Sequence, residues 1–414
     1  MQTMKILYFY RSPLPSPSAN AIQVVNTCAG MSRAGAGVVL GVESLATDST
    51  TECLTFFGIV DPAGPGGGSL DIRAFGRHWS WPFLHLRTRS LIGGAGAGSV
   101  LFVREVRPYV PGLIRRARLA GLKVIFEAHS VSSRLVEEKA RKEEETRGRE
   151  AARLRARAQE RGRLERAILG KVDGLICTQR ASLPLLQPML PGAAPAIVIG
   201  NAAPKRPAPL RNGPHIRRDI DLLYCGSLKR WKGVDGLLAA LPHLPGRGLT
   251  IVGLSLPSDV ARLALAASAL GVADRVTILP EVRPADVWSL YARSRVGVIP
   301  LPGRDWVEAR EYTSPLKLFE MLAAGLPVVA SRLPSIEEYV NDDRDALLVP
   351  PDDPAALAAA CGRLLNDATL HARISAAGRA RAAAFTWDAR GEKIVAFAAR
   401  VAGGASQPWE TPAP

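Results

Sequence analysis

The second half of the chain alternates short apolar runs with segments of helical periodicity, and this alternation constrains the fold more than any other feature. Each run is rich in branched residues, and each is followed by enough residues for a crossover helix. Parallel strands need connections of that length, so the pattern predicts a doubly wound α/β sheet. The expected strands are 221–225, 249–253, 276–279, 296–300, 328–330 and 346–349, with helices near 234–242, 258–270, 284–293, 315–324, 335–340 and 354–366.

The first half repeats this alternation less regularly. Strands are expected at 5–10, 38–42, 100–103, 124–126, 175–178 and 197–199, with a helix over 21–34. A chain of 414 residues is too long for one ordinary core. We therefore predict an α/β protein with two doubly wound domains, whose ligands bind at the carboxyl ends of the strands.

Changes in composition mark the domain boundaries. The predicted units are a first domain at 1–200, a linker at 201–218, a second domain at 219–384, a crossing helix at 385–402 and a disordered tail at 403–414. Within the first domain, the highly charged stretch 134–169 predicts one exposed helix or two helices broken near Gly148. A solvated surface and a coiled-coil partner site are both open for this insert.

The composition excludes several classes of protein. No apolar run approaches the ~20 residues of a membrane span. The run Met4–Tyr10 is too short for the apolar region of a signal peptide and leads into proline and serine. The five cysteines are scattered and include no metal-ligand pair. These features predict a cytoplasmic protein with buried thiols and no metal site.

A formal net charge of +15 calls for an anionic partner or surface. The sequence has no zinc-finger spacing, RNA-binding aromatic motif or basic helical repeat, so we expect no nucleic acid. Anionic lipid and an anionic substrate both fit the charge. An arginine-rich composition without any partner is the open alternative.

The segment around Pro315 predicts an anion site built from backbone. Ser314 is expected to accept a hydrogen bond from the first helical amides, with Pro315 at the first helical position. The amides of Leu316 and Lys317 then point outward at the positive end of the helix dipole, an arrangement typical of phosphate sites. Glu320, about one turn further on, can reach hydroxyls attached to such a phosphate.

A second phosphate-directed element follows the predicted strand 221–225 directly. Gly226 allows close approach of the backbone, and the cations of Lys229, Arg230 and Lys232 suit a diphosphate. Because both elements follow strands of one sheet, we expect them to converge on one pyrophosphate between the domains. For each element alone, an ordinary helix start and solvated cations are the alternative.

With these motifs the chain resembles the family 4 retaining glycosyltransferases, which have the GT-B fold of two Rossmann-like domains facing across a cleft. The most specific parts are the run 224–235 and the element Ser314-Pro-x-Lys-x-Phe-Glu320, found in a subset of the family. The resemblance implies that Lys232 contacts the donor diphosphate and that Glu320 binds the nucleotide ribose. It also implies that the amides of Leu316 and Lys317 hold phosphate.

The resemblance implies further residues in the first domain. His129, in Phe126-Glu-Ala-His129, matches a histidine that faces the donor sugar, although a structural histidine is the alternative from the residues alone. Ser18 and Asn20 match the loop that reaches the cleft. The predicted set comprises the catalytic residues His129 and Lys232, the donor-binding residues Gly226, Ser227, Arg230, Lys232, Gly253, Val282, Ser314, Leu316, Lys317 and Glu320, and the acceptor-side residues Ser18 and Asn20.

The chain departs from the family pattern at two positions. Tyr312 stands where the first residue of a paired-glutamate motif is usual, with Glu311 one position out of register. Ser227 stands where an arginine is frequent. Lys229 or Arg230 can supply that positive charge, because a diphosphate needs charge more than one particular side chain.

The function implied by the resemblance is transfer of a sugar, with retention, from a nucleotide-diphosphate sugar to a saccharide or lipid-linked acceptor in polysaccharide or glycolipid biosynthesis. Lys232 and the helix amides are suited to stabilise the departing diphosphate, so we expect no metal and no further cofactor. Two alternatives stay open. A GT-B sugar-nucleotide epimerase would need no acceptor, and a degenerate GT-B protein would bind nucleotide sugar without transfer.

Residues 73–89 interleave cations with aromatic side chains, as segments at membrane interfaces do. We hypothesise peripheral contact with the anionic inner face of the cytoplasmic membrane, where lipid-linked saccharides reside. An ordinary surface with partly buried aromatic residues is the alternative.

Overall fold

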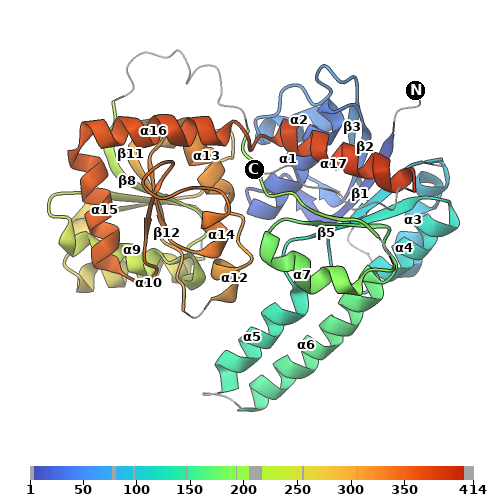
Figure 1. The fold of residues 1–414 in the computed structure, drawn as a ribbon, viewed down its shortest axis with the longest axis horizontal. Helices are drawn as coiled ribbons and strands as arrows, with labels where there is room; N and C mark the ends of the chain where they lie inside the picture. The colour runs from blue at the N-terminus through green and yellow to red at the C-terminus, as the bar shows by residue number, and fades with distance from the viewer. Residues whose placement is uncertain are drawn as a thin grey trace.

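Two α/β domains lie side by side in the computed structural model (Figure 1). The structure describes residues 4–76, 81–96, 98–144, 148–192, 194–204, 217–253, 256–304 and 306–404. Each domain is built on one parallel sheet with helices on both faces. The predicted α/β class with two doubly wound domains is confirmed.

The first sheet has seven parallel strands in the order β3-β2-β1-β4-β5-β6-β7. Their bounds are β1 Lys5–Leu14, β2 Gly37–Leu45, β3 Ser69–Ala74, β4 Val100–Val103, β5 Lys123–Ala128, β6 Gly174–Cys177 and β7 Ala196–Val198. The central strand β1 pairs Lys5 with Gly37 and Ile6 with Val100. Strand β3 is absent from the strands predicted above, because at this sheet edge Ile72 is its one buried residue and the apolar run of an interior strand is missing.

The second sheet has six parallel strands in the order β10-β9-β8-β11-β12-β13. Their bounds are β8 Ile220–Cys225, β9 Leu249–Val252, β10 Val276–Leu279, β11 Ser294–Ile299, β12 Val328–Ser331 and β13 Leu347–Val349. All six correspond to predicted strands. Apart from the edge strand β10, which is not fully buried, these strands are buried and read as continuous apolar runs, which is why they were visible in the sequence.

Apolar helix faces cover each side of both sheets. On the first sheet, α1 Ala19–Arg33, α2 Thr50–Phe56 and α17 Trp387–Ala402 contribute to one core, and α3 Trp81–Gly93, α4 Val110–Leu119 and α7 Leu183–Leu186 to the other. On the second sheet, α9 Val234–Ala240, α10 Pro257–Ala269, α15 Pro354–Asn366 and α16 Ala368–Ala382 contribute to one core, and α11 Val287–Arg293, α13 Leu316–Ala324 and α14 Pro334–Glu337 to the other.

The charged insert is a pair of helices that projects from the first domain (Figure 1). Helix α5 spans Ser132–Glu144 and α6 spans Gly148–Leu169, so the two-helix alternative is the observed one. Alanines of both helices are buried, among them Ala140 and Ala158. At one end of α5, the Nζ atom of Lys142 lies 3.9 Å from the ring centre of Trp306, beside the short helix α12 Val307–Arg310.

Four predicted segments lie partly outside the described residues. They are the linker, of which 205–216 is not described, the tail, of which 405–414 is not described, the segment 73–89, of which 77–80 is not described, and the charged insert 134–169, of which 145–147 is not described. Within the part of the chain that the structure describes, no helix is long and apolar enough to cross a membrane.

The C-terminal helix α17 packs on α1 of the first domain, far away in sequence (Figure 1). Thr386 caps it by accepting a hydrogen bond from the amide of Ala389 at 3.1 Å. The two helices approach so closely that a Cβ atom on Gly30 would lie 2.1 Å from the carbonyl oxygen of Trp387, and one on Gly391 would lie 2.1 Å from the carbonyl carbon of Gly30. Glycine at both positions therefore permits the crossing.

We expect Gly30→Ala to destabilise the protein by about 1–3 kcal/mol, because the added methyl group forces the two helices apart. The midpoint of chemical unfolding, followed by tryptophan fluorescence, measures the change. Gly236→Ala is the matched control: it also lies in a helix but has nothing within 4 Å of its Cβ position. The control should leave stability unchanged or raise it by up to about 1 kcal/mol. Equal midpoints for the two variants would contradict the close crossing.

Candidate functional site

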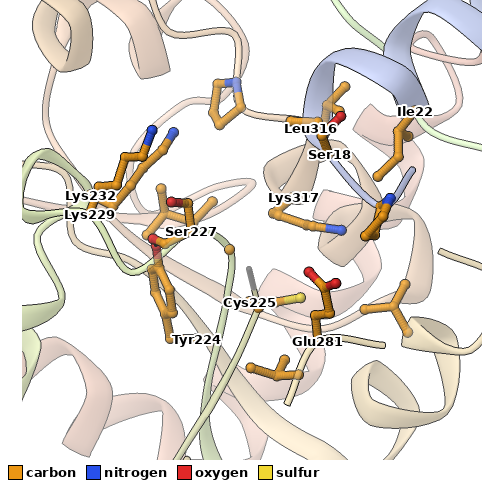
Figure 2. A pocket seen from close by; sticks show the side chains of 18 of the residues that line it. Ser18, Ile22, Tyr224, Cys225, Ser227, Lys229, Lys232, Glu281, Leu316 and Lys317 are labelled. Atoms are coloured by element: carbon orange, nitrogen blue, oxygen red, sulfur yellow. The ribbon is translucent and has the colours of Figure 1, made fainter. Parts of the chain in front are cut away.

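A cavity of about 400 Å³ opens between the carboxyl ends of the two sheets. Its walls come from the start of α1, from the loops after β8, β9, β10 and β11, and from the start of α13. Figure 2 shows Lys229 and Lys232 side by side at one wall, away from Lys317 and Leu316. This is the place where parallel α/β sheets bind their ligands.

The turn after β8 presents two lysines to the cavity. It contains the short helix η3 Arg230–Lys232 and ends at Gly233, which has a left-handed φ of 77°. A Cβ atom there would lie 1.6 Å from the carbonyl oxygen of Pro300, so the turn requires glycine. The Nζ atom of Lys232 lies 3.8 Å from the ring centre of Trp231. The turn thus fixes a cation at the edge of the cavity.

Burial, and then the charge of Lys229, lower the pKa of Lys232 to about 8. Among the residues that the structure describes, no carboxylate lies within ion-pair distance of Lys229 or Lys232. Two neighbouring cations without a counter-charge favour binding of an anion, which would restore the pKa of Lys232.

The predicted cap of α13 is wrong. Pro315 has an extended backbone with ψ of 111° and is itself the residue before the first helical residue, Leu316. Ser314 instead accepts the amide of Asn201 at 3.1 Å, and its carbonyl accepts the Asn201 side-chain amide at 2.8 Å. Because no side chain caps α13, its first amides stay available beside the cavity. The correction therefore strengthens the prediction of a backbone anion site.

Glu320 is held inside the protein rather than in the cavity wall. It is 4% exposed and its Oε2 atom accepts from Tyr291 at 2.6 Å and from Lys317 at 2.8 Å. Burial acts to lower the pKa of Lys317, but the neighbouring Glu320 holds this pKa above its usual value. Lys317 is therefore a charged side chain in the cavity wall, positioned by Glu320. Contact with a ribose would require Glu320 to exchange one of these partners.

Tyr312 takes part in packing between the domains. It is 6% exposed and lies with Val307 in a core cluster of the first domain. Glu311 pairs with Arg310 at 3.1 Å. The position of the family's first glutamate thus belongs to an interdomain contact in this chain, outside the cavity wall.

His129 lies next to a buried carboxylate that was missed in the sequence. Glu127 is 0% exposed, and its Oε2 atom lies 3.1 Å from Nε2 of His129. Tyr8 donates to the same carboxylate at 2.9 Å. The signal in the sequence was the position of Glu127 inside the apolar strand β5, where a charged residue must be paired.

This buried cluster reaches the cavity through α1. Arg104 donates to the side chains of Gln23 at 2.7 Å and Asn20 at 3.3 Å, and Asn20 lines the cavity. Gln23 in turn donates to Glu127 at 3.3 Å. The first-domain wall of the cavity is therefore held by a charged network.

Burial, and then the charge of Arg104, lower the pKa of His129 to about 4, although Glu127 acts in the opposite direction. Burial alone would raise the pKa of Glu127, but Arg390, His129 and Arg104 hold it well below its usual range. At neutral pH the pair consists of an ionised Glu127 and a neutral His129.

Most of the predicted site residues line the cavity. Arg230 lines a neighbouring hollow with Gly233 and Trp306, on the other side of the turn. The cavity is lined by Ser18, Asn20, Gly226, Ser227, Lys232, Gly253, Val282, Leu316 and Lys317, whereas His129, Arg230, Ser314 and Glu320 are outside its lining. Trp231 and Glu281 also line it and were not predicted. Within the described ranges, no three His, Cys, Asp or Glu side chains are grouped to hold a metal ion.

We expect the free energy of unfolding to fall as the pH is lowered from about 6.5 toward 4. Over this interval the unfolded chain protonates His129, whereas the folded chain, with a pKa of about 4, does not. The contribution is complete above 6.5 and amounts to at most about 3 kcal/mol. Urea titrations at several pH values measure it. His129→Gln should lose this part of the pH dependence, and an unchanged slope in that variant would contradict the assignment.

Comparison with known sequences finds a family match for part of the chain. Residues 219–367 match the protein family described as glycosyl transferases group 1. The chain is 34% identical over 170 residues to D-inositol 3-phosphate glycosyltransferase of Xylanimonas cellulosilytica, which is 40% of this chain and 39% of the relative. It is 34% identical over 185 residues to the protein of that name in Acidothermus cellulolyticus, with 42% and 39% covered. The chain thus spans about two fifths of the length of these curated relatives.

Similarity to solved structures extends over nearly the whole chain. Sucrose-phosphate synthase from Thermosynechococcus elongatus superposes with a TM-score of 0.70 at 19% identity, covering 97% of this chain and 100% of that chain. Anabaena HepE, solved in complex with UDP and glucose, gives 0.66 at 17% identity, covering 95% and 98%. At these identities the likeness concerns the fold. The predicted GT-B fold is confirmed, and residues 219–367 of the chain match the glycosyl transferases group 1 family.

Proposed function

We propose that this protein is a glycosyltransferase that moves a sugar from a nucleotide-diphosphate sugar to a saccharide or lipid-linked acceptor. The observation that carries the proposal is the convergence of Lys229, Lys232, Lys317 and the uncapped start of α13 on one interdomain cavity. Cations and helix amides together suit a diphosphate. The match of residues 219–367 to the glycosyl transferases group 1 family supports the same assignment.

The chemistry follows the movement of charge. Breaking the bond between the anomeric carbon and the diphosphate oxygen leaves negative charge on the diphosphate and positive charge on the sugar ring. Lys232 and the start of α13 line the cavity. There they can stabilise the departing group, whose charge grows in the transition state. The acceptor hydroxyl forms the new bond, and its proton leaves with the diphosphate. We propose retention, with the acceptor on the face of the leaving group.

Fixed cations can perform the role that a divalent metal performs in other sugar-transfer sites. Lys229, Lys232 and Lys317 border the cavity, and the charge of Lys317 is maintained by Glu320. We therefore propose transfer without a metal or other cofactor. In this proposal Lys232 acts on the leaving group, and His129, which lies outside the cavity lining, acts from the side of the sugar.

Thermal shift against UDP-, GDP- and ADP-sugars identifies the donor, since a ligand that binds the folded state raises the melting temperature. Product analysis with that donor then tests transfer, with and without EDTA. Transfer to an added saccharide or lipid-linked acceptor at the same rate in EDTA is expected. Isomerised donor without acceptor would identify an epimerase, and binding without any product would identify a degenerate protein.

We expect Lys232→Ala to weaken binding of the identified nucleotide sugar by about 10–100-fold, because a charged contact to the diphosphate is lost. Isothermal titration calorimetry measures the dissociation constant. Lys123→Ala is the matched control, because Lys123 is a lysine in a half-buried ion pair with Asp173 and does not line the cavity. Equal affinities for Lys232→Ala and the native protein would argue against the diphosphate site.

We further propose peripheral contact with the anionic inner face of the cytoplasmic membrane. On α3, Phe83 and Leu86 are 54% and 68% exposed and one helical turn apart. Exposed Arg115 and Arg118 lie on the neighbouring helix α4. Exposed apolar side chains beside arginines suit an anionic lipid surface.

In a flotation assay with vesicles rich in phosphatidylglycerol, the double variant Phe83→Ser, Leu86→Ser should bind about tenfold less than the native protein, because it loses apolar contact area. Leu265→Ser is the control: Leu265 is 72% exposed on α10 of the second domain. Native protein that does not float with these vesicles, or an equal loss in the control, would refute the membrane proposal.

A further inference from the structure

Glu127 is a carboxylate enclosed on all sides by donors. Besides Tyr8 and His129, it accepts from Gln23 at 3.3 Å and from Nη2 of Arg390, and the Arg390 side chain is 2% exposed. Arg390 lies on α17, so the C-terminal helix supplies the cation of a buried ion pair in the first domain. A buried carboxylate needs such a partner, because its charge is costly to bury alone.

All three nitrogen atoms of the Arg390 guanidinium donate hydrogen bonds. Besides Glu127, it donates to Thr27 on α1 at 3.2 Å, to the carbonyl of Ile199 at 2.6 Å and to the carbonyl of Gly200. A planar group with five donors can hold these acceptors in one fixed arrangement, and a lysine cannot. Arg390 therefore fixes the position of the Glu127 carboxylate relative to α1 and to the segment that follows β7.

That carboxylate decides which ring nitrogen of His129 carries the proton. Ionised Glu127 can only accept, so Nε2 of His129, 3.1 Å away, must donate. In the neutral ring, Nδ1 is then left as an acceptor. A histidine that meets a substrate hydroxyl needs one defined tautomer and one ring orientation, and Glu127 imposes both.

The same arginine also connects to the donor side of the cavity. Gly200 is followed by Asn201, which binds Ser314 through both its backbone amide and its side chain. Ser314 precedes the start of α13, whose Leu316 and Lys317 line the cavity. Hydrogen bonds and short stretches of backbone therefore connect His129, through Glu127 and Arg390, to the segment that joins the domains and on to α13.

We propose that Arg390 is a positioning residue for sugar transfer: by holding Glu127 it fixes the tautomer and orientation of His129. The inference rests on the proposed function for its consequence in catalysis, but not for its structural content. It makes the arrangement of the first-domain site dependent on docking of the C-terminal helix.

The test compares Arg390→Gln, Arg390→Lys and Glu127→Gln with the control Arg33→Gln. Arg33 pairs with Asp388 at 2.5 Å, so the control also breaks an ion pair between α1 and α17 but does not touch Glu127. Circular dichroism and the melting temperature establish which variants fold. If Arg390→Gln does not fold, Arg390→Lys and Glu127→Gln decide the question.

The first readout is independent of activity. Nitrogen NMR of histidine-labelled protein at neutral pH reports the tautomer of each ring, and His129→Gln identifies the His129 signals. We expect one Nε2–H tautomer in the native protein and in Arg33→Gln, but a tautomer mixture in Arg390→Gln and Glu127→Gln. A single Nε2–H tautomer in folded Arg390→Gln would overturn the role of Arg390, and one in folded Glu127→Gln would overturn the role of Glu127.

The second readout is kinetic, with the donor identified by thermal shift. Arg390→Gln should lower kcat about 100-fold while KM for the donor changes less than about threefold, because misplacement affects the reacting groups more than donor binding. Arg390→Lys, which keeps the charge, should recover part of kcat. An equal loss in Arg33→Gln would reduce Arg390 to a structural role. A native protein inactive with every donor would refute the proposed function, while the NMR result would still decide the positioning.

Discussion

The buried ion pair between Glu127 and Arg390 is the interaction on which the arrangement of this protein depends. It joins the fifth strand of the first sheet to a helix that comes 263 positions later in the chain. Such a pair does not by itself imply high stability, because removing both charges from water is costly. The pair instead contributes to the specificity of the fold. An unpaired Glu127 or Arg390 would be strongly unfavourable, so the pair favours one position of α17 on α1. The Gly30–Gly391 contact then sets how closely the two helices approach.

The cavity has two walls of different chemical character, one from each domain. The second-domain wall offers lysines and helix amides, and its charge suits an anion. The first-domain wall is organised by Arg104, Asn20 and Gln23, which connect it to Glu127 and His129. In the proposed transfer, the second domain would serve the leaving group, and the first domain the sugar and acceptor. The direct contacts of Asn201 with Ser314, and of Tyr339 with Thr178, hold the two walls at a defined separation.

Much of the fold was predictable because buried parallel strands leave continuous apolar runs and helices leave a regular period. Strand β3 was missed because an edge strand with Asp71 half-buried and Arg73 exposed has no such run. The place of Lys232, Lys317 and the start of α13 in the cavity wall was predictable from local sequence. Glycine, proline and lysine next to strand ends are typical of phosphate sites. Glu127 and Arg390 were missed because their role depends on a contact between segments that are far apart in the sequence. Ser314 was assigned to the wrong partner for the same reason: Asn201 competes for its hydroxyl.

The position of α17 also bears on how the protein is made. Trp387, Ile394 and Phe397 belong to the core of the first domain, although they are among the last described residues of the chain. During synthesis, one apolar flank of that domain must stay uncovered while the second domain is still being added. A nascent chain in that state exposes apolar surface that can aggregate or bind chaperones. A product truncated before α17 would expose the same surface permanently. The first domain therefore completes its core only after α17 has been synthesised.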